Sequence, residues 1–294
     1  MNIKIKIVGV AGAGTMGHGI AAVLLRSGCE AILCDSAAKA LDAAQEKVSA
    51  RLAREVEKGK WTAEEKSVAL GKLRTTTKLD DLASADLVIE AVTENFEIKA
   101  QAFRALDGCC RAQTIFATNT SAISITRLAA VTRRAPQFVG LHFFNPVPVM
   151  SLVEVVAGLE TSAATVSLAE NFARQLGKTP VRVNDFPGFV SNRILMPMIN
   201  EAIYAVMDGV AEPAAVDSVM KLGMNHPMGP LELADFIGLD VCLDIMRVLY
   251  EGFHDSRYRP CPLLEKMVAA GRLGRKSGRG FYNYSEAKSR PGAQ

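Results

Sequence analysis

Three closely spaced glycines, Gly12, Gly14 and Gly17, follow an apolar stretch near the start of this chain and restrict what it can form. Apolar residues alternate over residues 3–10, which predicts a strand, and the apolar residues after Gly17 have helical spacing. A strand, a glycine turn and a helix in this order predict a unit whose backbone N–H groups bind a pyrophosphate. The predicted contact residues for such a dinucleotide are Gly12, Ala13, Gly14, Thr15, Met16 and Gly17.

Asp35 ends the next apolar run, residues 31–34, about twenty residues after the glycines, where dinucleotide-binding folds place an acidic residue. A carboxylate at this point accepts hydrogen bonds from the adenosine ribose hydroxyls and repels a 2′-phosphate. We therefore predict NAD as the cofactor, while the nearby Lys39 leaves NADP open as a variant. The simpler alternative is a glycine-rich turn followed by a surface aspartate.

The bulk composition excludes several classes of protein. With 294 residues, 49% of them hydrophobic, and a net charge of +3, the chain has the profile of a globular protein and too little charge to predict nucleic-acid binding. Its apolar stretches are shorter than the ~20 residues of a membrane helix, and the first predicted strand begins too early to leave room for a targeting peptide. Six cysteines without CxxC or Cys/His spacing predict reduced thiols and no metal site. We therefore expect a cytoplasmic protein that does not bind membranes.

Strand and helix patterns alternate along the first part of the chain and then give way to helices alone. The remaining apolar runs that predict strands are residues 86–92, 114–118, 138–141, 152–156 and 180–183. Such continuous apolar runs are typical of strands covered on both faces in a mostly parallel sheet. The predicted fold class is α/β, with a Rossmann-type doubly wound sheet in residues 1–185 and a smaller all-helical domain in residues 186–294.

A helical stretch rich in Ala, Lys, Glu and Arg, residues 37–60, is expected to form an arm of the first domain. Its basic end includes Arg51 and Lys58, which belong either to a solvated helix face or to a clamp for a phosphorylated ligand. Thr62 and Glu65 then have the spacing of a capping box, which predicts the start of another helix.

Polar residues at strand ends are the candidate catalytic groups, because ligands of open α/β sheets bind beyond the carboxyl ends of the strands. Glu94 and Ser121 follow two of the predicted strands. His142 ends another, and Glu154 interrupts the apolar run that comes after a proline-broken segment. A hairpin-like return would bring His142 and Glu154 side by side, where the carboxylate orients the imidazole and fixes its tautomer. This pattern predicts an acid/base pair, with a structural histidine as the alternative.

With these residues identified, the chain resembles the 3-hydroxyacyl-CoA dehydrogenase family over nearly its full length, and most of all the short, single-function bacterial members that act on 3-hydroxybutyryl-CoA. The resemblance rests on motifs spread over both predicted domains in the family's order. These are GAGTMG at 12–17, VIEA at 88–91, TNTS at 118–121, GLHFFNP at 140–146, LVEV at 152–155, PGFVSNR at 187–193, HPMGP at 226–230 and GRKSG at 274–278.

The resemblance implies a role for each matching residue. His142 would remove the proton of the substrate's 3-hydroxyl as hydride leaves C3 for the nicotinamide, and Glu154 would be its partner. Ser121 and Asn192 match positions that hold the reacting oxygens of the substrate. The positions matched around the NAD are Asp35, Glu94, Lys99, Asn145 and Lys276, and those matched near the CoA moiety are Arg51 and Lys58.

The family's activity, as implied by the resemblance, is the interconversion of (S)-3-hydroxyacyl-CoA and 3-oxoacyl-CoA by a homodimer joined through the helical domain. Two alternatives remain open. One is an NAD-dependent dehydrogenase of a non-CoA hydroxy acid, such as a sugar acid or carnitine. The other is a dinucleotide-sensing protein that has lost catalysis. The second would be indicated by loss of His142 or Glu154, and both are present.

Overall fold

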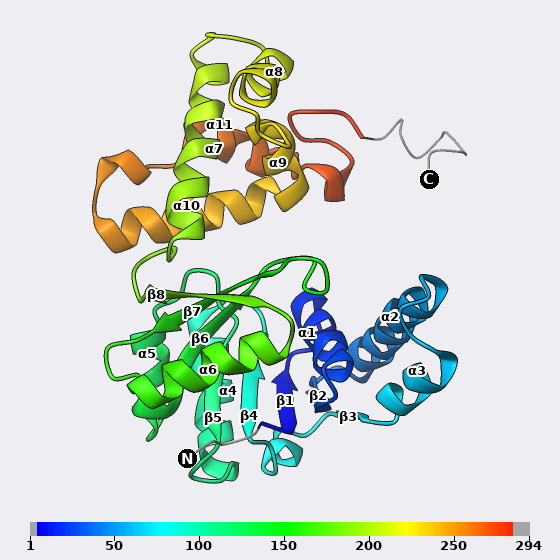
Figure 1. Cartoon of the computed structure of the whole chain (residues 1–294). Coiled ribbons are helices and arrows are strands. Elements are labelled where there is room, and N and C mark those ends of the chain that lie inside the picture. The colour runs from blue at the N-terminus through cyan, green and yellow to red at the C-terminus, as the bar shows by residue number, and fades with distance from the viewer. Residues whose placement is uncertain (1–4, 285–294) are drawn as a thin grey trace. The chain divides into compact units, whose positions relative to one another are not determined.

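The computed structural model describes residues 5–284, and the chain divides into two compact units, Met1–Phe186 and Pro187–Gln294 (Figure 1). The predicted first strand started at Ile3, which lies outside the described residues. Its observed start is Ile7, and Ile5 precedes the strand as buried but irregular chain, so the alternating pattern extended the prediction too far.

The first unit is built on one eight-stranded sheet in the order β3-β2-β1-β4-β5-β6-β7-β8 (Figure 1). Its strands are β1 (Ile7–Ala11), β2 (Glu30–Cys34), β3 (Leu73–Thr76), β4 (Leu87–Glu90), β5 (Ile115–Thr118), β6 (Phe138–Phe143), β7 (Leu152–Ala157) and β8 (Thr179–Asn184). Neighbouring strands are parallel except for β6 and β7, which are antiparallel. The mostly parallel, Rossmann-type sheet predicted from the sequence is confirmed.

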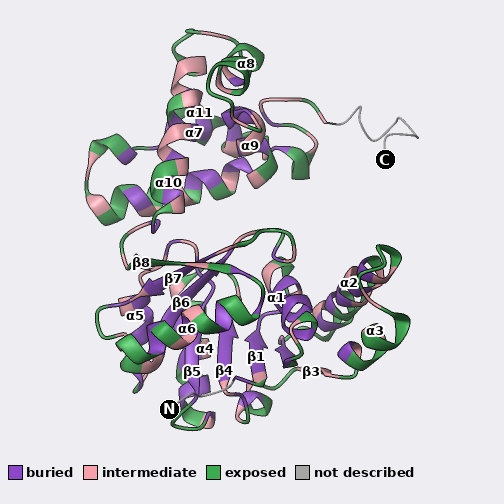
Figure 2. Cartoon of the chain, in the orientation of Figure 1, coloured by how far each residue is buried: buried purple, intermediate pink, exposed green. Residues whose placement is uncertain are grey.

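Helices cover both faces of this sheet. They are α1 (Thr15–Arg26), α2 (Ala38–Glu57), α3 (Ala63–Leu70), α4 (Phe96–Cys109), α5 (Ile125–Ala129) and α6 (Ala163–Gln175), with short 3-10 turns η1 (Leu79–Leu82) and η2 (Ala135–Gln137). On one face, Leu24 of α1 and Phe172 of α6 join a single buried cluster with the strands. On the other, Phe103 of α4 packs against Phe116 and Phe138, with ring centroids 5.7 and 4.6 Å apart. Figure 2 shows the central strands buried between these layers.

The arm predicted for residues 37–60 is the amphipathic helix α2, whose buried residues include Leu41, Val48 and Leu52. The capping box predicted after it is confirmed. The Thr62 hydroxyl accepts a hydrogen bond from the Glu65 N–H at 3.1 Å, and the Glu65 carboxylate accepts one from the Thr62 N–H at 2.7 Å. These two bonds fix the start of α3.

The second unit is helical, as predicted. Its elements are α7 (Ser191–Met207), α8 (Pro213–Gly223), α9 (Pro230–Ile237), α10 (Leu239–Phe253), η3 (Ser256–Tyr258), α11 (Pro262–Ala269) and η4 (Arg275–Ser277). Ile203, Leu243 and Met246 lie in its buried core. Two buried carboxylates bind backbone N–H groups there: Asp217 those of residues 231 and 232 at the start of α9, and Asp235 those of residues 281 and 282.

Candidate active site

The glycine loop joins β1 to α1 at the carboxyl edge of the sheet, and close backbone packing explains two of its three glycines. Gly12 has a φ of +107°, and a Cβ there would lie 2.4 Å from the carbonyl oxygen of Ala91. A Cβ at Gly17 would lie 1.8 Å from the carbonyl oxygen of Gly12. Both residues are therefore required by the fold itself, because the backbone passes too closely for a side chain.

Gly14 is different, because neither its conformation nor its surroundings in the protein demand glycine. Its φ is −66°, and a Cβ there would meet no atom within 4 Å. Gly14 is also the N-cap of α1 and offers no side chain to the free N–H groups of the first helical turn. An open, uncapped helix start with room for a close ligand fits the pyrophosphate of a dinucleotide.

Asp35 follows β2 and is tied directly to this loop. Its Oδ2 accepts a hydrogen bond from the Ala13 N–H at 2.8 Å, and its Oδ1 accepts one from the Ala37 N–H at 2.9 Å. Together with Gly12, Gly14 and residues 91–93, it lines a groove of about 580 Å³. The carboxylate thus lies in the same groove as the open helix start, at the position expected for an adenosine ribose.

A buried charge network lies beyond the ends of β4 and β5. The ammonium group of Lys99, on the first turn of α4, contacts Glu90 Oε1 at 2.7 Å and Glu94 Oε2 at 3.1 Å. Burial raises the pKa of the Glu90 carboxyl, against the opposing effect of Lys99. The other oxygen of Glu94 accepts the Ser121 N–H at 2.8 Å and the hydroxyl of Thr120. The structure therefore brings together three predicted site residues, Glu94, Lys99 and Ser121.

His142 and Glu154 are direct partners across the antiparallel strands β6 and β7. Nδ1 of His142 lies 2.7 Å from Oε2 of Glu154, and the two residues are only 5% and 2% exposed. An ionised carboxylate can only accept, so in that state Nδ1 carries the proton and donates it to Glu154. The contact orients the imidazole and leaves Nε2 as the nitrogen of the ring that does not face the carboxylate.

The proline-broken segment between β6 and β7, residues 144–151, carries Asn145 at an exposed position. Asn145 lines a hollow of about 290 Å³ together with residues of α1 and α2. The α1 and α2 residues include His18, Lys47, Arg51 and Arg54. Arg51 thus lies near Asn145 in the fold, although an ion pair with Glu55 at 3.5 Å balances part of its charge. Lys58 is not among the residues that line this hollow, because it follows the end of α2 about two turns beyond Arg51.

Two predicted site residues belong to the second unit. Asn192 is buried on the first turn of α7. Lys276 lies in η4 and forms an ion pair with Asp240 at 2.5 Å.

Sequence reasoning missed two residues that support the site. Lys178, immediately before β8, donates hydrogen bonds to the carbonyl oxygens of Val147 at 2.5 Å and Met150 at 2.7 Å, and so holds the segment that carries Asn145. Burial lowers the pKa of this lysine. Asn119 accepts the Phe143 N–H at 2.9 Å and joins β5 to the end of β6. Both act over long sequence separations, and local patterns carry no signal for such contacts.

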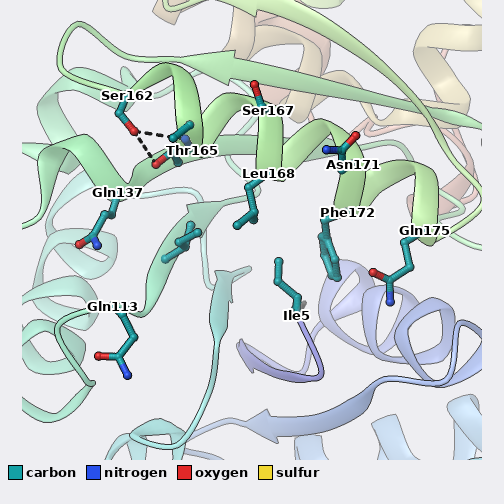
Figure 3. A pocket seen from close by; sticks show the side chains of 12 residues that line it. Ile5, Gln113, Gln137, Ser162, Thr165, Ser167, Leu168, Asn171, Phe172 and Gln175 are labelled. Atoms are coloured by element: carbon teal, nitrogen blue, oxygen red, sulfur yellow. Dashed lines mark hydrogen bonds between the residues drawn. The ribbon is translucent and has the colours of Figure 1, made fainter. Parts of the chain in front are cut away.

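A further hollow, of about 460 Å³, lies at the opposite edge of the sheet (Figure 3). Its lining includes Ile5 before β1, Ile115 at the start of β5, Gln137 before β6 and a face of α6. Its lining residues, all within the described chain, include no ionisable side chain. Because it lies at the amino ends of the strands, it is separate from the predicted catalytic groups.

Neither a membrane-spanning helix nor a metal-binding cluster occurs within residues 5–284. None of the helices there has both the length and the apolar character to cross a membrane. The same residues contain no cluster of three or more His, Cys, Asp or Glu side chains arranged to hold a metal ion.

Comparison with known proteins identifies the family. Residues 7–186 match the NAD-binding domain of 3-hydroxyacyl-CoA dehydrogenase, and residues 188–284 match the C-terminal domain of the same family. A probable 3-hydroxybutyryl-CoA dehydrogenase of Bacillus subtilis is 54% identical over 98% of this chain and 100% of its own length. A 3-hydroxybutyryl-CoA dehydrogenase of Bradyrhizobium diazoefficiens is 53% identical over 99% of each chain.

A solved structure agrees with these matches. The crystal structure of (S)-3-hydroxybutyryl-CoA dehydrogenase from Ralstonia eutropha superimposes with a TM-score of 0.93 at 50% identity, covering 96% of this chain and 100% of that one. The likeness extends through both units. The chain therefore belongs to the 3-hydroxyacyl-CoA dehydrogenase family and is an NAD-dependent oxidoreductase.

Proposed function

We propose that this enzyme oxidises (S)-3-hydroxybutyryl-CoA to acetoacetyl-CoA with NAD and catalyses the reverse reduction. The observation that carries the proposal is the buried His142–Glu154 pair at the carboxyl edge of the sheet, the edge that also holds the open glycine loop. The names of the similar proteins support the choice of substrate.

His142 is proposed to move the proton of the substrate hydroxyl. A secondary alcohol is a weak acid, so its proton must leave as hydride leaves the same carbon. With Nδ1 held by Glu154, Nε2 takes this proton during oxidation and returns it during reduction. Glu154 stabilises the imidazolium that forms, because the carboxylate lies against the ring and both residues are almost fully buried. Ser121 is proposed to hold the reacting oxygen of the substrate.

The cofactor, when bound, supplies the hydride acceptor, and the chain's residues supply its position. The uncapped start of α1 in residues 12–17 is proposed to bind the pyrophosphate, and Asp35 the adenosine ribose. Glu94, Lys99 and Asn145 are proposed to lie near the nicotinamide half. For Asn192 as a substrate residue and Lys276 as a cofactor residue, the proposal rests on the family resemblance alone.

The CoA moiety is proposed to lie along the hollow between α1, α2 and Asn145. Its cationic residues Lys47, Arg51 and Arg54 suit a phosphorylated ligand, which supports the clamp hypothesis over a merely solvated helix face. Of the two residues predicted to bind CoA, Arg51 is the better supported, because it lines this hollow and Lys58 does not.

The test is a spectrophotometric assay of cofactor oxidation with acetoacetyl-CoA, with NADH and NADPH in separate cuvettes. We expect rapid consumption of NADH. Preference for NADPH would refute the argument from Asp35 but keep the reaction. NADH binding without turnover, together with activity on free hydroxy acids, would favour the non-CoA alternative, and absence of any turnover would favour a dinucleotide sensor.

We further propose a homodimer formed through the second unit. The helices α7 and α8 and the chain near them leave large apolar side chains exposed, among them Val210, Val219, Leu222 and Met224. Exposed apolar patches mark interfaces, and the family resemblance names a second copy as the partner. Light scattering after gel filtration should give a dimer mass, and Leu222→Glu should shift it toward the monomer.

A cytoplasmic location is proposed on the basis of the cysteines. All six are free thiols, and five of them are buried. Burial raises the pKa of Cys110 and Cys242 to about 12 each, so these thiols are protonated and unreactive near neutral pH. Free thiols are typical of reducing compartments. Cell fractionation with a specific antibody would test this location.

A further inference from the structure

The network around Lys99 has one accessible member. Lys99 and Glu90 are 1% and 0% exposed, whereas the side chain of Glu94 is 44% exposed. The three ammonium protons of Lys99 have three acceptors within the chain, namely Glu90, Glu94 and, more weakly at 3.4 Å, the carbonyl oxygen of Val92. Of the two predicted cofactor residues in this network, Glu94 is the one that a ligand reaches first.

Glu90 holds the ammonium group of Lys99 on its buried side. Its Oε1 contacts Lys99 and accepts the Val92 N–H at 2.7 Å, and its Oε2 accepts the Thr118 hydroxyl at 2.7 Å. Both carboxylate oxygens are thus held by groups from β5, from α4 and from the chain between β4 and α4. Because the pair is buried and fully bonded, it gives Lys99 one defined position from which to hold Glu94.

Glu94 in turn spans two regions of the site. Its Oε2 faces Lys99, on the side where the nicotinamide half of the dinucleotide is proposed to lie. Its Oε1 accepts the Ser121 N–H and the Thr120 hydroxyl, and the Thr120 oxygen accepts the Ile123 N–H at 2.9 Å. One carboxylate therefore connects the cofactor region to the turn that carries the proposed substrate residue Ser121.

We infer that Glu94 couples dinucleotide binding to acyl-CoA binding, with Lys99 and Glu90 as positioning residues that hold it in place. A ribose hydroxyl that bonds Glu94 restricts the carboxylate, and the restricted carboxylate fixes the Ser121 turn in its substrate-binding form. Each ligand then strengthens the binding of the other by the same factor. This inference rests on the proposed function, because acyl-CoA must be the substrate.

The test is an equilibrium measurement. NAD⁺ and acetoacetyl-CoA are both in the oxidised state, so the protein binds them together without reaction. Titration calorimetry gives the Kd of NAD⁺ for the free protein and for protein saturated with acetoacetyl-CoA, and the ratio of the two is the coupling factor. We expect a factor of about five or more for the unchanged protein and close to one for Glu94→Gln.

Glu94→Gln keeps the size of the side chain and removes the charge that pairs with Lys99, and its exposed position makes folding robust. Glu97→Gln, the same change at an exposed position on the first turn of α4, is the matched control and should keep the full factor. Ser121→Ala retains the backbone N–H that bonds Glu94, so it should weaken acetoacetyl-CoA binding yet preserve the coupling factor.

Three results would overturn the inference: a factor near one in the unchanged protein, an unchanged factor in Glu94→Gln, or loss of the factor in Ser121→Ala. Failure of the proposed function looks different, because the unchanged protein would then bind NAD⁺ but not acetoacetyl-CoA.

Discussion

Glu154 Oε2 lies 2.7 Å from His142 Nδ1, and the two residues stand directly opposite each other in the antiparallel register of β6 and β7. They are twelve residues apart in sequence and both almost fully buried. A buried carboxylate is stable only with partners, and a buried imidazole needs a fixed tautomer to act as a base. The contact satisfies both needs.

His142→Gln should lower kcat by about 10²- to 10⁴-fold, because proton transfer then loses its base. The Kd of NADH, measured by fluorescence titration, should change little. His254→Asn is a suitable control, since His254 is an exposed cap of α10 in the left-handed conformation that Asn tolerates. Near-normal turnover of His142→Gln would remove this residue from the mechanism.

Glu154→Gln should retain the fold but reduce kcat by at least about tenfold, because the amide can accept from Nδ1 but cannot stabilise an imidazolium by charge. Glu154→Ala should also lower the melting temperature, since it leaves a cavity and an unpaired ring N–H. Steady-state kinetics and thermal melts of the two variants separate the contribution of the Glu154 charge to kcat from the contribution of its packing to stability. Equal kcat values for Glu154→Gln and the parent would contradict the proposed role.

Gly14→Ala should weaken NADH binding, whereas Gly17→Ala should lower the stability of the fold. A methyl group at Gly14 meets no protein atom within 4 Å, so the melting temperature should stay close to that of the parent while NADH binds at least about tenfold more weakly. A methyl group at Gly17 collides with the Gly12 carbonyl, so this variant should lose about 1–3 kcal/mol of stability or fail to fold. Unchanged NADH affinity in Gly14→Ala would show that the ligand does not approach this loop.

Asp35→Ala should weaken NAD binding and narrow the preference for NAD over NADP, because the carboxylate that repels a 2′-phosphate is gone. The substitution also removes the acceptor of the Ala13 N–H. Asp35→Asn removes the charge but keeps one of the two acceptors of backbone N–H groups. Comparing kcat/KM for NADH and NADPH in both variants therefore separates the loss of charge from the loss of the whole side chain. An unchanged preference in both would exclude Asp35 as the selecting residue.

Asp107 on α4 should make the first unit sensitive to acid. Burial by itself raises the pKa of this carboxyl, but hydrogen bonds from the Arg133 N–H and from the Arg134 and Arg133 side chains outweigh burial and hold the pKa below its ordinary value. A lowered pKa in the folded state stabilises the protein above the unfolded pKa of about 3.9, and this contribution disappears as the pH falls through the folded value.

Asp107→Asn should therefore cost about 3 kcal/mol at pH 7, because it leaves the buried Arg134 without its carboxylate partner. Urea unfolding at pH 7 and pH 3.5 measures this cost. The difference between variant and parent should shrink at the lower pH. A difference that does not depend on pH would mean that Asp107 contributes packing and not charge.

Much of the first unit was predictable because its signals are local. The glycine spacing, the apolar runs and the capping box at Thr62 each specify an element from a few neighbouring residues. The strand β3 and the helix α5 were missed because they are short, and the residues of β3 are half-exposed or exposed and form no apolar run. The start of β1 was placed too early because alternation at Ile3 and Ile5 continues past the paired residues.

The candidate site was predictable where one residue stands at the end of a strand, as His142 does. It was less predictable where two distant segments meet. The hydrogen bond between Glu94 and the Ser121 N–H spans 27 residues, and that between Lys178 and the Val147 carbonyl spans 31. The alignment of strand ends decides such contacts, and no pattern along the chain encodes that alignment.

The direction change between β6 and β7 has a consequence for how this protein can diverge. Side chains alternate along a strand, so sliding β7 by one residue against β6 would turn Glu154 to the other face while preserving every residue type. An insertion or deletion within β7 is thus as damaging as loss of the carboxylate. Length changes are tolerable in residues 144–151, where a loop can absorb them. Sequence changes in this part of the protein must therefore preserve the register of β7 against β6 as well as the identity of its residues.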